Sequence, residues 1–512
     1  MNRSNFSRRN GVITILLFIT FFVYSQDDKV QIIDRFIHDT MDDWHVPGLA
    51  IAIVKDNDVI FSKGYGVRDI DTKMPIDINT VFQICSITKT FTASGIGMLV
   101  QDGKLNWDDH VIDYIPEFKL SDPYATREIT VRDLLCHRTG LPMYCLDPIV
   151  FNREDFDVKE VIRRIQYIEP DYSLRSAFKY TNATFLIAGE IISEVSGLNW
   201  DDFIQQKIFN PLKMTSSFTD FNDLKKNQEN NVATPYKLID EKIVKVPNFE
   251  FNKTKPAASI CSNVTDLAQW IKAIASNGKY EGKEILKPSI IDEMESSQVV
   301  IRPRGYWETP YLGAKILTYG LGWFIYEYAG EKVIQHGGGT LGYRSTLCVV
   351  PDKKFGFIIL TNLGTGNNNL PEVISYKILD VFFGKDDHDW NSVFLTKLLL
   401  TKEQNEAKEK QLISENVKGT IPAFNLKDYS GIYENQFIGK INIECDSTYL
   451  KIKLGDGRFS NGKLRHWHFN TFRIMWDYDF ITPCLVTFHI GAEGSVNELN
   501  IENFGIFKRV LD

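Results

Sequence analysis

Ser86 and Lys89 are the residues of this chain whose types and spacing best suit covalent chemistry. They are the first and last residues of the stretch Ser86-Ile87-Thr88-Lys89. This stretch begins a segment, 86–102, whose sequence predicts a helix that ends at Gly103. Positions i and i+3 of a helix share a face, so the lysine can reach the serine hydroxyl, a weak nucleophile that needs an adjacent base. The helix N-terminus would also stabilise an oxyanion. The alternative is a capping serine beside a solvated lysine.

A second polar group is Tyr180-Thr181-Asn182. In an extended segment, residues two apart point to the same side, so the phenol and the amide would face one cleft. A tyrosine has a reference pKa of about 10, and a nearby ammonium favours its anionic form. Tyr180 could therefore move a proton between Ser86 and a leaving group. The alternative is a half-buried tyrosine followed by a helix-capping asparagine.

A third segment, His336-Gly337-Gly338-Gly339, lies at the end of a predicted strand. Glycines let a substrate backbone approach closely, and they leave N–H groups free to bind an oxyanion. We therefore expect His336, Gly338 and Gly339 to bind substrate. A flexible hairpin loop is the alternative.

The elements that must position these segments follow a simple order. Apolar runs at 49–55 and 59–63 predict a hairpin, and a long region of helical periodicity follows, with 183–196 as its clearest helix. Further strands are expected at 319–328, 331–337, 344–350 and 355–361, and a helix at 370–383. This order predicts one antiparallel sheet that is built from both ends of the segment, with a helical insert between them.

The last part of the chain differs from the rest. Residues 386–424 are rich in lysine and glutamate, which predicts a helical or extended linker. Residues 425–512 contain short alternating runs separated by glycine, asparagine and aspartate, as in a β-sandwich or an up-and-down barrel.

The first 25 residues predict a secretory signal peptide. Arg8 and Arg9 precede a twelve-residue apolar run, 12–23, and small Ser25 follows it. The run is shorter than the about 20 residues that span a bilayer, so we expect a periplasmic or secreted protein with no stable membrane span after cleavage. A retained anchor is the alternative.

Net charge and amino-acid composition disfavour some classes of function. The formal net charge of -8 argues against a nucleic-acid partner. Seven cysteines occur without a CxxC spacing, and we expect most of them to be small buried side chains. No metal or other cofactor is expected.

Taken together, the three polar segments resemble those of a known family. Their order is similar to that in penicillin-binding proteins, class C β-lactamases, D-Ala-D-Ala carboxypeptidases and CubicO-type peptidases. Further matching stretches are Gly103 to Asp109, Tyr114 to Pro116, Ile129 to Pro142, Ile208 to Met214 and Pro256 to Ile260. The resemblance covers about residues 30 to 384, and 464–472 resembles a lipocalin-like C-terminal domain.

The resemblance implies an α/β (α+β) β-lactamase/transpeptidase-like fold and a role for each residue. Ser86 would form an acyl-enzyme, and Lys89 and Tyr180 would share the acid and base work, with the choice of base left open. Asn182 would hold the substrate amide, and the N–H groups of Ser86 and Gly339 would form the oxyanion hole. His137 would be structural.

One departure from the family concerns His336. Many relatives have Lys-Thr-Gly where this chain has His336-Gly337-Gly338. A histidine with an ordinary pKa of about 6.5 is mostly neutral at pH 7. We therefore expect weak β-lactamase activity, and we expect His336 to bind a substrate carboxylate only below about pH 6.5.

The sequence thus predicts a signal peptide (1–25), a catalytic domain (26–385), a linker (386–424) and a lipocalin-like β-barrel (425–512). The expected activity is cleavage of an amide, in particular in a D-amino-acid-containing peptide, or of an ester. Partners would be small peptides, esters or β-lactams, and cell-wall peptides are included. The alternatives are an esterase, a weak β-lactamase, or an inactive protein that binds cell-wall fragments.

Overall fold

Two segments far apart in the chain build one antiparallel sheet of eight strands, in the computed structural model that describes residues 25–227, 230–302, 311–312, 314–384, 388–446, 448–478 and 481–510. The predicted leader lies outside the described residues except for Ser25. The strands are β1 (Gly48–Lys55), β2 (Asp58–Gly66), β9 (Val299–Ile301), β10 (Leu317–Tyr319), β11 (Phe324–Tyr328), β12 (Glu331–Gly339), β13 (Arg344–Val350) and β14 (Phe355–Thr361). Their order is β2-β1-β14-β13-β12-β11-β10-β9, which confirms the sheet predicted from both ends.

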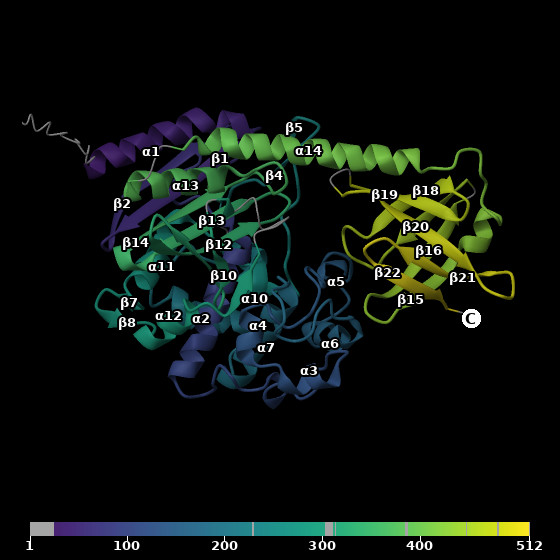
Figure 1. The fold of residues 1–512 in the computed structure, drawn as a ribbon, viewed down its shortest axis with the longest axis horizontal. Coiled ribbons are helices and arrows are strands. Elements are labelled where there is room, and N and C mark those ends of the chain that lie inside the picture. The colour runs from purple at the N-terminus through teal and green to yellow at the C-terminus, as the bar shows by residue number, and fades with distance from the viewer. Residues whose placement is uncertain are drawn as a thin grey trace, which may run out of the picture.

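Helices cover both faces of this sheet (Figure 1). On one side lie α1 (Gln26–Thr40) and α13 (Leu370–Phe383), which contact each other. On the other side, α11 (Val264–Ala275) packs on β1 and β14. Strands β1 and β14 are buried along nearly their whole length, because each of their faces meets a helix layer.

The helical insert lies between β2 and β9 and carries two elements of the site. Most of the predicted helix at 86–102 forms α2 (Thr88–Gln101), with Ser86 on a turn just before it, and the predicted helix at 183–196 forms α7 (Asn182–Ser196). Gly197 ends α7 with a φ of 73°, a backbone conformation that suits glycine. The other α-helices of this region are α3 (Pro123–Glu128), α4 (Val131–Leu135), α5 (Asp147–Asn152), α6 (Val158–Arg164), α8 (Trp200–Ile204), α9 (Phe221–Lys226), α10 (Lys255–Ala258) and α12 (Pro288–Met294). Short two-stranded pairs join β3 (Phe82–Gln83) to β6 (Cys261–Ser262), β4 (Tyr236–Ile239) to β5 (Lys242–Lys245), and β7 (Lys279–Tyr280) to β8 (Lys283–Glu284).

The structure corrects the boundary of one predicted strand. The range 319–328 is two strands, β10 and β11, joined by a tight turn. Gly322 has a φ of 81° in this turn, and a Cβ there would lie 2.8 Å from Ala93 Cβ on α2. The turn therefore allows the sheet to approach the nucleophile helix closely.

The C-terminal part is a closed barrel of eight strands. They are β15 (Gly431–Asn435), β16 (Gly439–Asp446), β17 (Tyr449–Lys453), β18 (Asn461–His468), β19 (Thr471–Trp476), β20 (Cys484–Ile490), β21 (Val496–Ile501) and β22 (Gly505–Arg509). Each strand pairs with the next, and β22 returns to β15 through Tyr433 and Arg509. Its own apolar core includes Tyr429, Tyr433 and Phe488. Of the two alternatives, sandwich and up-and-down barrel, the barrel is the one observed.

The expected linker contains a 25-residue helix, α14 (Trp390–Ser414), which runs from the catalytic domain to the barrel (Figure 1). Its first turns are anchored, because Trp390 stacks on Tyr376 at 4.5 Å and its Nε1 donates to Asp380 Oδ2 at 2.6 Å. Its later turns are largely exposed, in agreement with their charged composition.

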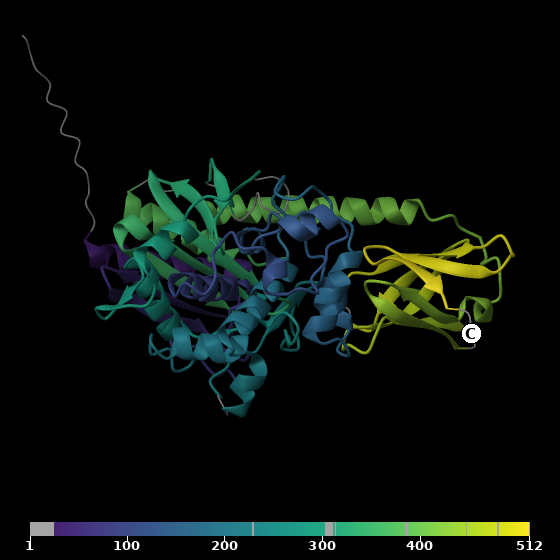
Figure 2. The same cartoon turned by 90° about the horizontal axis from the view of Figure 1, so that it is seen from below.

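The barrel packs against the helical insert next to α5 and α6 (Figure 2). Arg153, which is 8% exposed, donates to the carbonyls of Ile438 and Lys440 at 3.2 and 2.9 Å. Phe249 of the catalytic domain stacks on Phe459 of the barrel at 5.9 Å. These contacts hold one end of the barrel against the domain that carries Ser86.

Two further features of the described residues are the state of the cysteines and the apolar character of the helices. All seven cysteines are free, and five of them are buried, which agrees with their expected apolar role. Among the residues that the structure describes, no helix has the length and apolar character that crossing a membrane requires.

The anchoring of α14 predicts where the chain can be shortened. A chain that ends at Lys402 should keep a folded catalytic domain, because it retains Trp390 and Phe394. A chain that ends at Gly384 loses both buried side chains, and burying one large aromatic contributes about 3–5 kcal/mol. Urea unfolding of the two purified proteins measures the difference. Equal unfolding free energies would show that α14 does not stabilise the domain.

Candidate active site

Ser86 lies on a short 3-10 turn, Cys85–Ile87, immediately before α2. The preceding residue, Cys85, has a φ of 53°, which is an uncommon conformation for a side chain other than glycine. Neighbouring segments hold this turn: Ile84 N–H donates to Ile260 O at 2.9 Å, and Ser345 Oγ donates to Ile84 O at 3.0 Å. A strained backbone kept in place by its surroundings is a common feature of functional sites.

Lys89 lies within the first turn of α2 and is fully buried. Its Nζ is 3.2 Å from Ser86 Oγ, 2.8 Å from Asn182 Oδ1 and 2.9 Å from Ala257 O. It also lies 4.7 Å from the centre of the Tyr180 ring. Burial lowers the pKa of Lys89 well below its ordinary value, because a charged ammonium is disfavoured away from water. The amine can therefore accept a proton from Ser86.

Tyr180 and Asn182 come from the end of an extended segment and the first turn of α7, whose N-cap is Thr181. His137 positions this segment, since Thr181 N–H donates to His137 Nδ1 at 3.3 Å and the His137 ring packs 4.4 Å from that of Tyr180. This contact explains how a histidine beside the site can be structural. Tyr180, Asn182 and Ser86 all line one cleft.

The glycines of β12 lie on the opposite side of the nucleophile turn. The pairing of β11 with β12 ends at Gln335, so His336 to Gly339 extend beyond the neighbouring strand. At Gly338 an added Cβ would lie 2.1 Å from Ile84 O, and at Gly339 it would lie 2.3 Å from Thr365 Cγ2. Only glycine allows β12 to lie this close to the turn that carries Ser86.

The protonation expected of His336 is corrected by the structure. Its side chain is 1% exposed, its Nε2 lies 3.1 Å from Tyr319 Oη, and its Nδ1 lies 2.7 Å from Gly337 O. Burial, with a smaller effect of the nearby Lys89, lowers the pKa of His336 to about 3. The imidazole therefore stays neutral near pH 6.5, and the charge that its residue type predicts at that pH is not gained.

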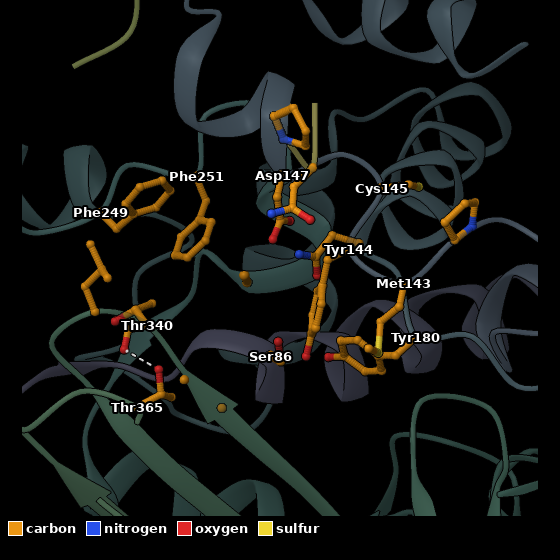
Figure 3. A pocket seen from close by; sticks show the side chains of 18 of the residues that line it. Ser86, Met143, Tyr144, Cys145, Asp147, Tyr180, Phe249, Phe251, Thr340 and Thr365 are labelled. Atoms are coloured by element: carbon orange, nitrogen blue, oxygen red, sulfur yellow. Dashed lines mark hydrogen bonds between the residues drawn. The ribbon is translucent and has the colours of Figure 1, made fainter. Parts of the chain in front are cut away.

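The cleft has a volume of about 1030 Å³ and includes residues that the sequence analysis did not identify. Tyr144 and Asp147 follow the Gly140-Leu141-Pro142 stretch, and Figure 3 shows Tyr144 and Tyr180 pointing toward Ser86. Ala257 belongs to a stretch that matched the family, but a backbone acceptor leaves no signature in side-chain types. Barrel residues also line the cleft, among them Phe437, Phe459, Trp476 and Phe504.

Comparisons with known proteins agree with this geometry. The family model described as Beta-lactamase matches residues 33–378, and a second model, described as a domain of unknown function, matches residues 415–511. The chain is 26% identical over 445 residues to Unguisins hydrolase ungD of Aspergillus violaceofuscus, which covers 82% of this chain and 77% of that protein. It is 28% identical to Protein flp of Staphylococcus aureus, over 66% of this chain and 64% of that protein.

Solved structures show the same fold. An octameric penicillin-binding protein homologue from Pyrococcus abyssi superposes with a TM-score of 0.61 at 25% identity, over 94% of this chain and all of that one. A D-stereospecific amidohydrolase from Streptomyces sp. superposes with a TM-score of 0.56 at 23% identity, over 70% of this chain and 99% of that one. Since the family model spans most of the sequence, from the helix before β1 to α13, this chain belongs to the beta-lactamase family.

Proposed function

We propose that this protein cleaves an amide or ester bond through an acyl-enzyme on Ser86. The observation that carries the proposal is the buried Lys89 amine, 3.2 Å from Ser86 Oγ, with its pKa lowered by burial. A neutral amine at this distance can act as the base that a serine nucleophile needs. Membership of the beta-lactamase family also supports a hydrolase.

The proposed reaction has two halves. Ser86 Oγ attacks the substrate carbonyl while its proton moves to Lys89, and the N–H groups of Ser86 and Gly339 stabilise the oxyanion. The proton then passes to the leaving amine or alcohol through Lys89 or Tyr180, and the acyl group remains on Ser86. A water molecule then attacks this ester and loses a proton to Lys89 or Tyr180. The bond between the acyl carbon and Ser86 Oγ breaks, Ser86 Oγ takes up that proton, and the acid leaves. Asn182 would orient the substrate amide.

The natural substrate is proposed from the relatives. Their names include a hydrolase of unguisins, a hydrolase with promiscuous acyltransferase activity and a D-stereospecific amidohydrolase. We favour a peptide that contains a D-amino acid, and an ester is the second choice. β-Lactamase activity is disfavoured because buried, neutral His336 supplies no charge for a substrate carboxylate. We also propose secretion, on the basis of residues 1–25.

An inactive binding protein is the competing function. It would need the fold and the cleft, but it would have no use for a buried lysine amine beside a serine hydroxyl. Burying a lysine is costly, and the atoms that accept hydrogen bonds from the Lys89 amine are all neutral. This cost favours the enzyme over the binding protein.

Removing the nucleophile tests the proposal directly. We expect Ser86→Ala to abolish covalent labelling by a fluorophosphonate probe, because the proposed reaction takes its attacking oxygen from Ser86. Intact-protein mass spectrometry counts the label, and circular dichroism checks the fold. The matched control is Ser173→Ala, which removes an exposed serine outside the cleft and should label as the wild type does. Full labelling of the Ser86→Ala protein would refute the assignment.

The lowered pKa of Lys89 predicts the pH dependence of acylation. The reactive form is the neutral amine, so the rate should rise with pH and then stay constant once Lys89 is deprotonated. Because burial lowers the pKa of this amine, the plateau should begin well below the pKa of about 10.4 of an ordinary lysine. The measurement is the second-order rate of labelling by an uncharged fluorophosphonate. A rate that still rises near pH 10 would contradict a neutral Lys89.

The environment of His336 predicts the result of introducing the lysine found in many relatives. We expect His336→Lys to lower the free energy of unfolding by about 3 kcal/mol or more, because it buries an ammonium with no carboxylate partner. His336→Gln is the control, since it keeps a neutral polar group. Urea unfolding measures both. An unchanged stability together with a selective gain on carboxylate substrates would show that this position faces the substrate.

A further inference from the structure

Asp147 is a carboxylate of the catalytic cleft to which the mechanism above gives no role. It follows Tyr144 by three residues, its N–H donates to Tyr144 O at 2.9 Å, and it begins the short helix α5. Figure 3 shows it on the Tyr144 side of the pocket, away from Thr340 and Thr365. Its side chain has no hydrogen-bond or ion-pair partner among the residues that the structure describes.

Capping of a helix does not explain this carboxylate. Asp157, at the start of the next helix, shows the usual arrangement, in which its Oδ1 accepts from Glu160 N–H at 2.7 Å. Asp147 makes no such bond, and α5 has no side-chain cap. Its oxygens are therefore available to a molecule in the cleft.

The charges around the cleft are unbalanced at this point. Apart from tyrosines and two cysteines, the described lining residues with ionisable side chains are Asp147, His336, Arg344 and Glu372. Arg344 and Glu372 pair with each other at 2.5 Å, and His336 is neutral. The charge that remains is the negative one that Asp147 carries when it is ionised, above a pH of about 7. Such a cleft attracts a cation and repels a substrate carboxylate.

Burial makes this carboxylate a strong partner for a cation. It raises the pKa of the Asp147 carboxyl to about 7, and the nearby Lys89 opposes the rise. An ionised carboxylate in this environment lacks the hydration that it would have in water, so an opposite charge and a hydrogen bond stabilise it strongly.

Pairing at Asp147 would also assist the base. Burial lowers the pKa of Lys89, whereas the negative charge of Asp147 acts in the opposite direction and raises it. A cation bound to Asp147 cancels that charge, so it favours the neutral amine that takes the proton of Ser86. Substrate binding and activation of the nucleophile would thus support each other.

We infer that Asp147 binds an ammonium group of the substrate in the cleft that Ser86 lines. The inference rests on the proposed function and narrows it, since a substrate with a free amine fits the cleft and one with a free carboxylate does not. Two sources share this chemistry, the α-amine of an N-terminal residue and the amine of a basic side chain. An aminopeptidase or amidase is therefore favoured over a carboxypeptidase.

Three p-nitroanilides that differ in the presence and position of an ammonium group test the inference in the full chain. D-Alanine p-nitroanilide carries an α-ammonium, N-acetyl-D-lysine p-nitroanilide a side-chain ammonium, and N-acetyl-D-alanine p-nitroanilide no charge. We expect kcat/KM for one of the cationic substrates to exceed that for the neutral one by about tenfold or more, and the preferred cation identifies the source. In Asp147→Asn this ratio should fall by about tenfold, mainly through KM.

Two variants serve as controls. Glu169→Gln removes an exposed negative charge next to the lining residue Ile168 but outside the cleft, and it should leave the ratio unchanged. Asp147→Glu keeps the charge and should keep part of the preference. An equal ratio in the wild type and in Asp147→Asn, or a preference for the neutral substrate in the wild type, would overturn the inference.

A binding measurement separates this inference from the proposed function. Calorimetry on the Ser86→Ala protein compares D-alanine amide and 1,5-diaminopentane with N-acetyl-D-alanine amide, and it needs no turnover. Tighter binding of either cation, lost in Ser86→Ala/Asp147→Asn, would support the ammonium site even if Ser86 failed to react. Absence of that difference would refute the site even if Ser86 were labelled efficiently.

Discussion

The burial of the Lys89 amine is the constraint on which the rest of the site depends. A lysine exposed to water would be protonated at neutral pH and could not take a proton from Ser86. Three neutral acceptors from different elements, Ser86, Asn182 and Ala257, surround Nζ and replace water. The site must therefore exclude water from the Lys89 amine and still admit a substrate to Ser86 beside it. The helical insert buries the amine, and β12 with its glycines leaves room for the substrate.

The features that could be predicted from the sequence are those that local patterns encode. The spacing of Ser86 and Lys89, the hairpin of β1 and β2, and the helices α7 and α13 follow from periodicity and turn residues. The antiparallel sheet and the barrel followed from the order of such elements. The division of 319–328 into two strands was missed, because it depends on the approach of Gly322 to α2.

The environment of individual side chains could not be predicted in the same way. His336 was identified as a cleft residue, but its protonation depends on Tyr319 and on burial beneath other rings, which come from distant segments. Asp147 and the barrel residues of the cleft have no motif around them. Their importance arises from where the fold places them, and in particular from the contact between the barrel and the helical insert.

The pairing of β1 with β14 has a consequence for how activity arises during synthesis. Leu49 lies opposite Thr361, although more than half of the chain separates them. Contacts between such distant segments form slowly, because a long loop must close first. A ribosome that has made Ser86 and Lys89 must still add the strands β9 to β14 before the sheet that supports them exists. The nascent chain therefore carries Ser86 and Lys89 through a long part of its synthesis without a formed site, and the site can assemble only after β14, which ends at Thr361, has been made.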